Sequence, residues 1–189
     1  MKKIAIIGAG ISGLFFANLL NDNTDYDFTI FDKKPEIETK DGYGIQLSVN
    51  SIELLNQIGF KNINQNEIYN PKKIIFINSK NKQKICDLDI SKFNYEESKY
   101  TTLKRSTLIK FLLKNIPREK IKLNSELINF THEKKLTLSF SNKFIENFDF
   151  LIVSDGVFSK TKSIILKKNI RPEYFKSVAV RGNLRNYPN

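Results

Sequence analysis

The chain begins with two short apolar runs separated by a stretch of helical spacing. Ile4 to Ile7 carries no charge, and Phe28 to Phe31 forms the second run. Short uncharged runs of this kind are typical of strands buried on both faces of a parallel sheet. The residues between them, around Leu14 to Leu20, have the apolar pattern of a helix. The sequence therefore predicts a strand–helix–strand unit and an α/β fold.

The pattern changes to antiparallel signals further along. Between Lys72 and Ile90, two apolar runs flank a polar turn at Ser79 to Lys82, which predicts a hairpin inside an antiparallel insertion over about 67–100. A short strand at Thr101 to Leu103 and a helix from Arg105 follow. Later strands are predicted at Ile121 to Phe130, Leu136 to Phe140 and Ser177 to Gly182, and a helix at Lys160 to Leu166. The apolar run Asn147 to Val153 predicts a central strand covered on both faces.

Three glycines stand where the first strand gives way to the first helix. Gly8 permits a sharp turn, Gly10 lets the backbone approach a pyrophosphate, and Gly13 permits close packing of the helix on the sheet. The helix N-terminus favours a negatively charged phosphate. Asp32 ends the second strand, where a carboxylate can bind ribose hydroxyls. The pattern predicts a dinucleotide-binding unit, and the alternative is a glycine-rich turn without a ligand.

Composition excludes several other classes. The lysines behind the net charge of +11 are scattered, and only five of the basic residues are Arg, so a nucleic-acid surface is not expected. Cys86 and His132 are each the only residue of their type, which argues against disulfides, a metal site and a His-dependent nucleophile. The run after Lys2 and Lys3 is too broken for a membrane span and lacks a signal-peptide cleavage site. We expect a soluble cytoplasmic protein.

Four segments in order resemble the FAD-dependent aromatic hydroxylases of the para-hydroxybenzoate hydroxylase type, including salicylate hydroxylase-like and ubiquinone-biosynthesis hydroxylase-like enzymes. They are Gly8 to Leu14 with Asp32, Gly42 to Leu47 with Asn50, Leu103 to Leu108, and Phe150 to Lys162 with its Asp155-Gly156 pair. The last segment distinguishes this family from ordinary NAD dehydrogenases. The resemblance covers only the N-terminal half of the family.

The resemblance implies a monooxygenase that uses NAD(P)H, FAD and O₂ to hydroxylate an aromatic or phenol-like small molecule. It implies a Rossmann-like FAD-binding domain over 1–170, with the start of a substrate-domain β-sheet over 171–189. Because the cofactor carries the chemistry, the implied site residues bind FAD, and no catalytic acid or base is assigned. These residues are Gly8, Ala9, Gly10, Ser12, Gly13, Asp32, Lys33, Gly44, Ile45, Arg105, Asp155 and Gly156.

Four departures from the family pattern leave alternatives open. Asp32 stands where relatives more often have Glu, and Ser154 replaces a small apolar residue. Lys33 and Lys34 suit the 2′-phosphate of NADP, but Asp32 would repel that phosphate, so FAD is favoured. The second Gly-Asp motif of the family is missing, so the chain is expected to bind FAD weakly and to turn over poorly by itself. A separate C-terminal half is one candidate partner, and a truncated gene or a fragment of a longer protein are the other readings. The alternatives are a related reductase or halogenase-like flavoprotein, and an inactive nucleotide-binding remnant.

Overall fold

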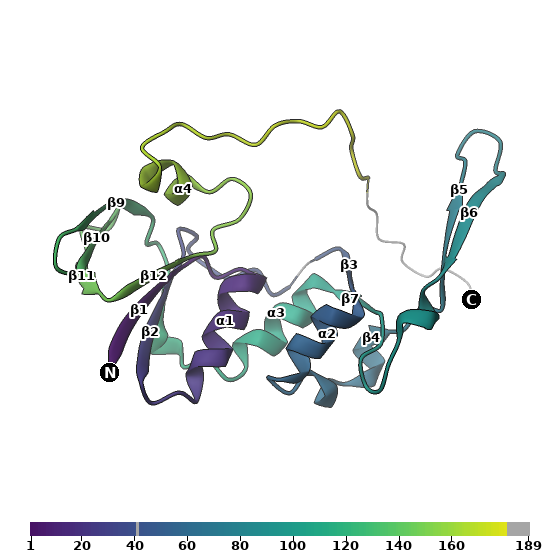
Figure 1. The fold of residues 1–189 in the computed structure, drawn as a ribbon, viewed down its shortest axis with the longest axis horizontal. Coiled ribbons are helices and arrows are strands. Elements are labelled where there is room, and N and C mark those ends of the chain that lie inside the picture. Colours follow the sequence, from purple (N-terminus) through teal and green to yellow (C-terminus); the bar gives the residue numbers. More distant parts are fainter. Residues whose placement is uncertain (41, 181–189) are drawn as a thin grey trace. The chain divides into compact units, whose positions relative to one another are not determined.

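The computed structural model describes residues 1–40 and 42–180, which fall into two compact units (Figure 1). The first unit contains residues 1–39 and the described residues from 112 onward. The second contains the described residues of 40–111. Each unit is built around its own sheets, so each is described separately.

A four-stranded parallel sheet organises the first unit. Its order is β12 (Phe150–Val153), β1 (Lys2–Ile7), β2 (Tyr26–Phe31) and β8 (Ile121–Lys122). Helix α1 (Ile11–Asn21) connects β1 to β2, which pair in parallel along their whole length. The predicted strand–helix–strand unit is confirmed.

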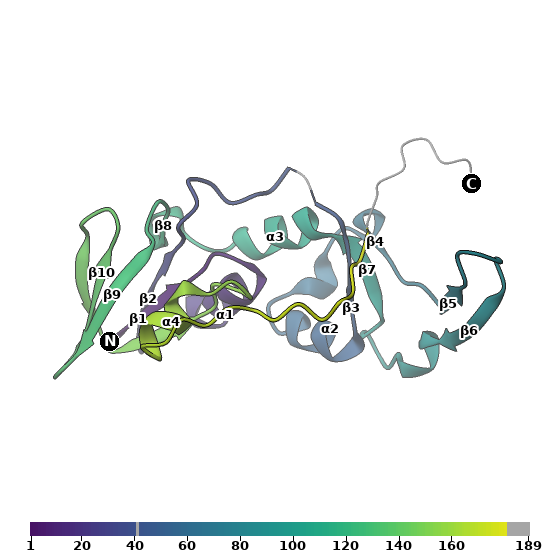
Figure 2. The same cartoon turned by 90° about the horizontal axis from the view of Figure 1, so that it is seen from above.

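The parallel sheet lies between α1 and an antiparallel meander. The meander consists of β9 (Leu127–His132), β10 (Leu136–Phe140) and β11 (Ile145–Phe148), in the order β11-β10-β9. In both views the meander and α1 lie on opposite faces of β1 and β2 (Figures 1 and 2).

Phe31 is the centre of the core beneath the meander. It is fully buried, stacks on Phe140 with ring centroids 4.1 Å apart, and meets the edge of Phe148 at 5.8 Å. Ala5 and Ile7 of β1 belong to the same cluster. Since side chains alternate along a strand, Ile4 and Ile6 point to the other face, which α1 covers.

Two predicted strands of the first unit are wrong in their extent. The segment 121–130 divides into β8 and β9, because Asn124 adopts a left-handed conformation (φ 52°) and Ser125 N–H donates to Asp32 O at 2.9 Å. The segment 147–153 divides into β11 and β12 at Asp149. Within the described residues β12 is an edge strand whose Phe150 is 42 % exposed, so the predicted central, fully covered strand is also wrong.

The second unit contains a three-stranded antiparallel sheet in the order β3-β7-β4, together with the predicted hairpin. Its strands are β3 (Gly44–Leu47), β4 (Ile68–Tyr69), β5 (Lys73–Ile77), β6 (Lys84–Asp89) and β7 (Thr101–Lys104). Its helices are α2 (Val49–Asn56) and α3 (Arg105–Leu113), the second of which runs to the boundary of the unit. Among the described residues, strands β5 and β6 pair only with each other, which confirms the antiparallel insertion.

Helix α4 (Lys160–Ile165) follows β12, as predicted. Short 3₁₀ turns complete the chain at Phe60–Asn62, Gln65–Glu67, Ile90–Phe93 and Arg118–Lys120. The strand predicted over 177–182 is not formed at residues 177–180, and residues 181 and 182 lie outside the described part. No helix among the described residues is long and apolar enough to cross a bilayer.

Candidate functional site

The loop between β1 and α1 can be built only with glycine at two positions. Gly8 has φ +108°, and a Cβ there would lie 2.5 Å from the carbonyl oxygen of Ser154. A Cβ on Gly13 would lie 2.0 Å from the carbonyl oxygen of Gly8. Both neighbours are backbone atoms that cannot rotate away. These two glycines therefore serve close packing of β1, α1 and β12, as the sequence predicted for Gly13.

Gly10 differs because open space surrounds it. It precedes α1 with an extended backbone (φ −85°, ψ −173°), and a Cβ there would meet nothing within 4 Å. Leu14 N–H donates to its carbonyl at 3.0 Å, which begins the helix. Ser12 is exposed in the first turn, whereas Ala9 is buried. The absence of a side chain at Gly10 thus leaves an approach to the N-terminus of α1, where backbone N–H groups and the helix dipole favour an anion.

Asp32 is tied directly to this loop. Its Oδ2 accepts a hydrogen bond from Ala9 N–H at 2.8 Å, and its Oδ1 accepts one from Lys34 N–H at 2.9 Å. The carboxylate is half-buried at the end of β2, and Lys33 beside it is exposed. A carboxylate held in this way has lone pairs left for hydroxyl donors, since its two oxygens accept about four hydrogen bonds in total.

Ser154 fixes the loop from the other side. Its Oγ donates to the carbonyl of Ile7 at 2.9 Å and lies 3.3 Å from that of Gly8, while its backbone N–H also donates to Ile7 at 2.8 Å. The sequence marked Ser154 only as a departure from the family pattern, and this anchoring role was missed. The available signal was a hydroxyl at the end of an apolar strand, where a buried donor needs a partner.

Asp155 and Gly156 lie directly beside the glycine loop. Asp155 Cα is 3.0 Å from the position that a Cβ on Gly8 would occupy, and Gly156 turns the chain with φ +83°. Asp155 Oδ2 accepts from Thr161 N–H at 3.2 Å, but its Oδ1 is buried and has no hydrogen-bond partner in the described part of the chain. A buried carboxylate oxygen without a donor is costly, so this atom is suited to a ligand hydroxyl.

The remaining predicted residues gather in the second unit. Gly44 and Ile45 lie on β3, opposite Lys104 and Leu103 of β7. Arg105 begins α3 directly after β7, and its backbone N–H donates to Tyr43 O at 3.0 Å. The structure therefore places Gly44, Ile45 and Arg105 close together within the second unit.

The residues of this candidate site can bind a ligand, and none of them is placed as a catalytic acid, base or nucleophile. Loop backbone, a helix N-terminus and two carboxylates provide donors for a diphosphate and acceptors for sugar hydroxyls. Over residues 1–40 and 42–180, no three His, Cys, Asp or Glu side chains are grouped to hold a metal ion. His132 is exposed at the end of β9 and Cys86 is exposed on β6.

Comparisons with known proteins match a short N-terminal segment to a domain family and most of the chain to individual proteins. Residues 6–41 match the NAD(P)-binding Rossmann-like domain. Over 181 residues the chain is 25 % identical to the monooxygenase asqM of Emericella nidulans, an alignment that covers 86 % of this chain and 40 % of that protein. A 59-residue segment, 31 % of the chain, is 39 % identical to 14 % of 3-amino-4-hydroxybenzoate 2-monooxygenase of Streptomyces cremeus.

Solved structures show the same fold. The HpxO protein of Klebsiella pneumoniae, determined with FAD and uric acid, superposes with a TM-score of 0.75 at 19 % identity, covering 89 % of this chain and 42 % of that one. The 2,6-dihydroxypyridine-3-hydroxylase of Arthrobacter nicotinovorans gives 0.74 at 17 % identity, covering 92 % and 41 %. The chain spans about 40 % of the length of the curated relatives it matches.

Proposed function

We propose that this chain belongs to the FAD-dependent monooxygenase family and forms the FAD-binding part of an enzyme that hydroxylates an aromatic or phenol-like substrate with NAD(P)H and O₂. The observation that carries this proposal is the glycine loop, with open space at Gly10 and the Asp32 carboxylate fixed beside it. The FAD-bound HpxO structure supports the choice of FAD over NAD.

The residues of the first unit fit FAD in a specific way. The open approach at Gly10 would admit the pyrophosphate to the N-terminus of α1, and Asp32 would accept hydrogen bonds from the adenosine ribose. The buried Oδ1 of Asp155 would accept one further hydroxyl of the cofactor. Gly44, Ile45 and Arg105 are proposed to hold the flavin part. When bound, FAD supplies the electron transfer and oxygen activation, and the protein orients it and excludes water.

The proposal extends to the organisation of the whole enzyme. Residues 1–170 are assigned to the FAD-binding domain, with its insertion at about 67–100, and residues 171–189 to the beginning of a substrate domain. The proposed location is the cytoplasm, which is compatible with the exposed free thiol of Cys86.

A titration with flavin fragments tests this function. Because the loop and Asp32 contact the adenosine diphosphate part, the purified chain should bind FAD more tightly than FMN or riboflavin, and ADP should compete with FAD. Flavin fluorescence and equilibrium dialysis measure both effects. Absence of saturable FAD binding, or equal affinity for FAD and FMN, would contradict the assignment.

A further inference from the structure

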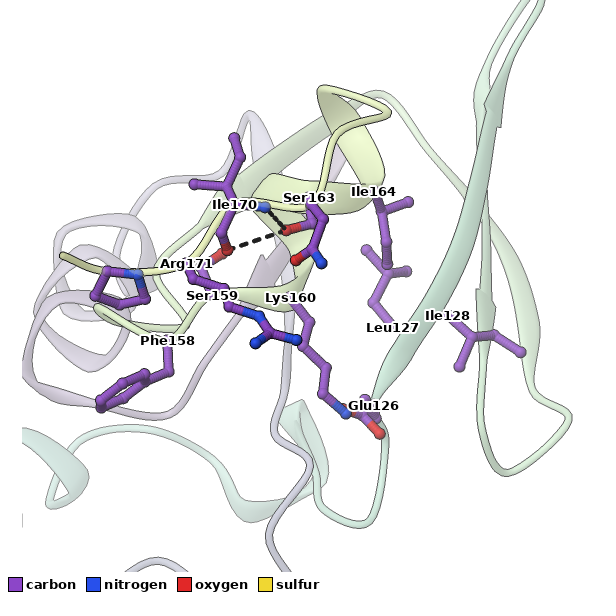
Figure 3. Close-up of a pocket in the computed structure, with 12 residues that line it drawn as sticks. Glu126, Leu127, Ile128, Phe158, Ser159, Lys160, Ser163, Ile164, Ile170 and Arg171 are labelled. Atoms are coloured by element: carbon purple, nitrogen blue, oxygen red, sulfur yellow. Dashed lines mark hydrogen bonds and ion pairs between the residues drawn. The ribbon is translucent and has the colours of Figure 1, made fainter.

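A cavity lies in the first unit, between α4, strand β9 and the segment after α4 (Figure 3). Its volume of about 720 Å³ falls in the range of small-molecule sites. The nucleotide residues discussed above do not line it. Its walls are mainly apolar, with Leu127 and Ile128 from β9, Ile164 from α4, and Ile170 beyond it.

Local hydrogen bonds hold the wall opposite β9 in place. Ser163 Oγ on α4 accepts from Ile170 N–H at 3.1 Å and lies 3.4 Å from Ile170 O (Figure 3). Lys168 N–H donates to Ser163 O at 3.2 Å. Lys167 is left-handed (φ 48°), which turns the chain back along the helix. These contacts hold the backbone as far as Ile170, the residue before Arg171.

One of the two basic side chains that line the cavity has no acidic partner among the described residues. Lys160 and Arg171 are basic and Glu126 is acidic, and they are the only ionisable residues of the lining. Lys160 Nζ pairs with Glu126 Oε1 at 2.6 Å. No carboxylate among the described residues pairs with Arg171, and in Figure 3 its side chain extends in the same direction as that of Lys160. The lining thus has a net charge of +1 from a free guanidinium.

We propose that this cavity binds a small amphipathic monoanion, with an aromatic or aliphatic body against the apolar walls and a carboxylate on Arg171. A guanidinium presents paired N–H groups that match the two oxygens of a carboxylate. The net charge of +1 matches a single carboxylate better than a dianionic phosphate. Phe158, exposed at the cavity, provides a ring face for an aromatic ligand. None of the residues assigned to FAD lines this cavity, so the proposal does not depend on the proposed flavin site.

Titration of the purified chain with fluorescent naphthalene-2-carboxylate tests the proposal. We expect saturable binding by anisotropy, weakened at least about tenfold by Arg171→Gln and partly restored by Arg171→Lys. The neutral isostere 2-naphthamide should bind more weakly and should not respond to Arg171→Gln. Phe158→Ser should weaken both compounds. Arg118→Gln, at an exposed arginine of another turn, is the matched control and should change neither.

The outcomes that overturn the proposal are equally specific. They are the absence of saturable binding, equal affinities for acid and amide, and equal effects of Arg171→Gln and Arg118→Gln. Displacement of the probe by FAD would place it in the nucleotide site and would also overturn the proposal. Arg171 is exposed and makes no ion pair with the described residues, so the variant should unfold at the same urea concentration as the parent chain. Loss of FAD binding by the parent chain leaves this test unaffected.

Discussion

The carboxylate of Asp32 accepts a hydrogen bond from the backbone N–H of Ala9 at 2.8 Å, which joins the end of β2 to the glycine loop after β1. The same carboxylate accepts from Lys34 N–H at 2.9 Å. Asp32 therefore holds the loop in its present shape as well as offering acceptors to a ribose. Removing the side chain should affect both the loop and the ligand.

Asp32→Ala should weaken FAD binding by about 1.5–3 kcal/mol, or roughly 10- to 150-fold, because a charged acceptor is lost and Ala9 N–H is left without its partner. Isothermal titration or flavin fluorescence measures the change. Glu36→Ala, at an exposed acid nearby in sequence, is the control and should retain the parent affinity. Unchanged affinity in Asp32→Ala would remove Asp32 from the proposed ribose role.

Gly10 and Gly13 should respond to alanine in opposite ways. Gly13→Ala forces a Cβ to within 2.0 Å of Gly8 O, so the free energy of unfolding should fall by about 1–3 kcal/mol or more. Gly10→Ala meets no neighbour and adopts an allowed backbone, so the folded chain should be unaffected or stabilised by up to about 1 kcal/mol. Its methyl group would occupy the approach to α1, so FAD affinity should decrease.

Urea denaturation and FAD titration of the two glycine variants separate these effects. A Gly10→Ala protein that is as stable as the parent and binds FAD equally well would show that no ligand approaches the loop there. A Gly13→Ala protein of parental stability would contradict the packing argument.

The sequence predicted the first unit well where the apolar pattern of a strand and a helix agrees with the residue types of the turn between them. Gly8, Gly13 and Asp32 lie as their spacing indicated, because a tight turn between a strand and a helix leaves few conformations available. The errors arose from tertiary context. The break at Asn124 depends on hydrogen bonds to the segment after β2, and the edge position of β12 depends on which strands surround it. An apolar run in the sequence indicates a strand, but it shows neither where contacts with other segments interrupt that strand nor its position in the sheet.

The identity of the acceptor of Ser154 was likewise beyond the sequence, because Ile7 is distant from Ser154 in the chain. Ser154→Ala removes the bond from Oγ to Ile7 O, and we expect the free energy of unfolding to fall by about 1 kcal/mol. Affinity for FAD should fall less than in Asp32→Ala, since the backbone bond from Ser154 to Ile7 remains. Ser79→Ala, in the exposed turn of the β5–β6 hairpin, is the control for urea denaturation. Equal stability of the two variants would exclude the anchoring role.

Asp149, at the junction of β11 and β12, should make stability depend on pH. Its Oδ2 accepts from Lys3 N–H at 2.8 Å, and this hydrogen bond, with a smaller contribution from the Lys135 and Lys2 charges, lowers the pKa of the carboxyl below 3.8. A lowered pKa means that the folded state binds the proton less tightly than the unfolded state. The stabilisation is therefore fully present above pH 3.8 and is lost as the pH falls through the lower folded-state value.

Asp149→Asn provides the measurement. At neutral pH the variant should unfold at a lower urea concentration than the parent chain, because its amide oxygen is a weaker acceptor for Lys3 N–H. On acidification below 3.8 the parent carboxylate becomes protonated, so the two unfolding curves should converge. Asp25→Asn, at an exposed position outside the sheet, should follow the parent chain at every pH. A difference between Asp149→Asn and the parent that stays constant through this pH range would show that the carboxylate charge contributes nothing to the junction.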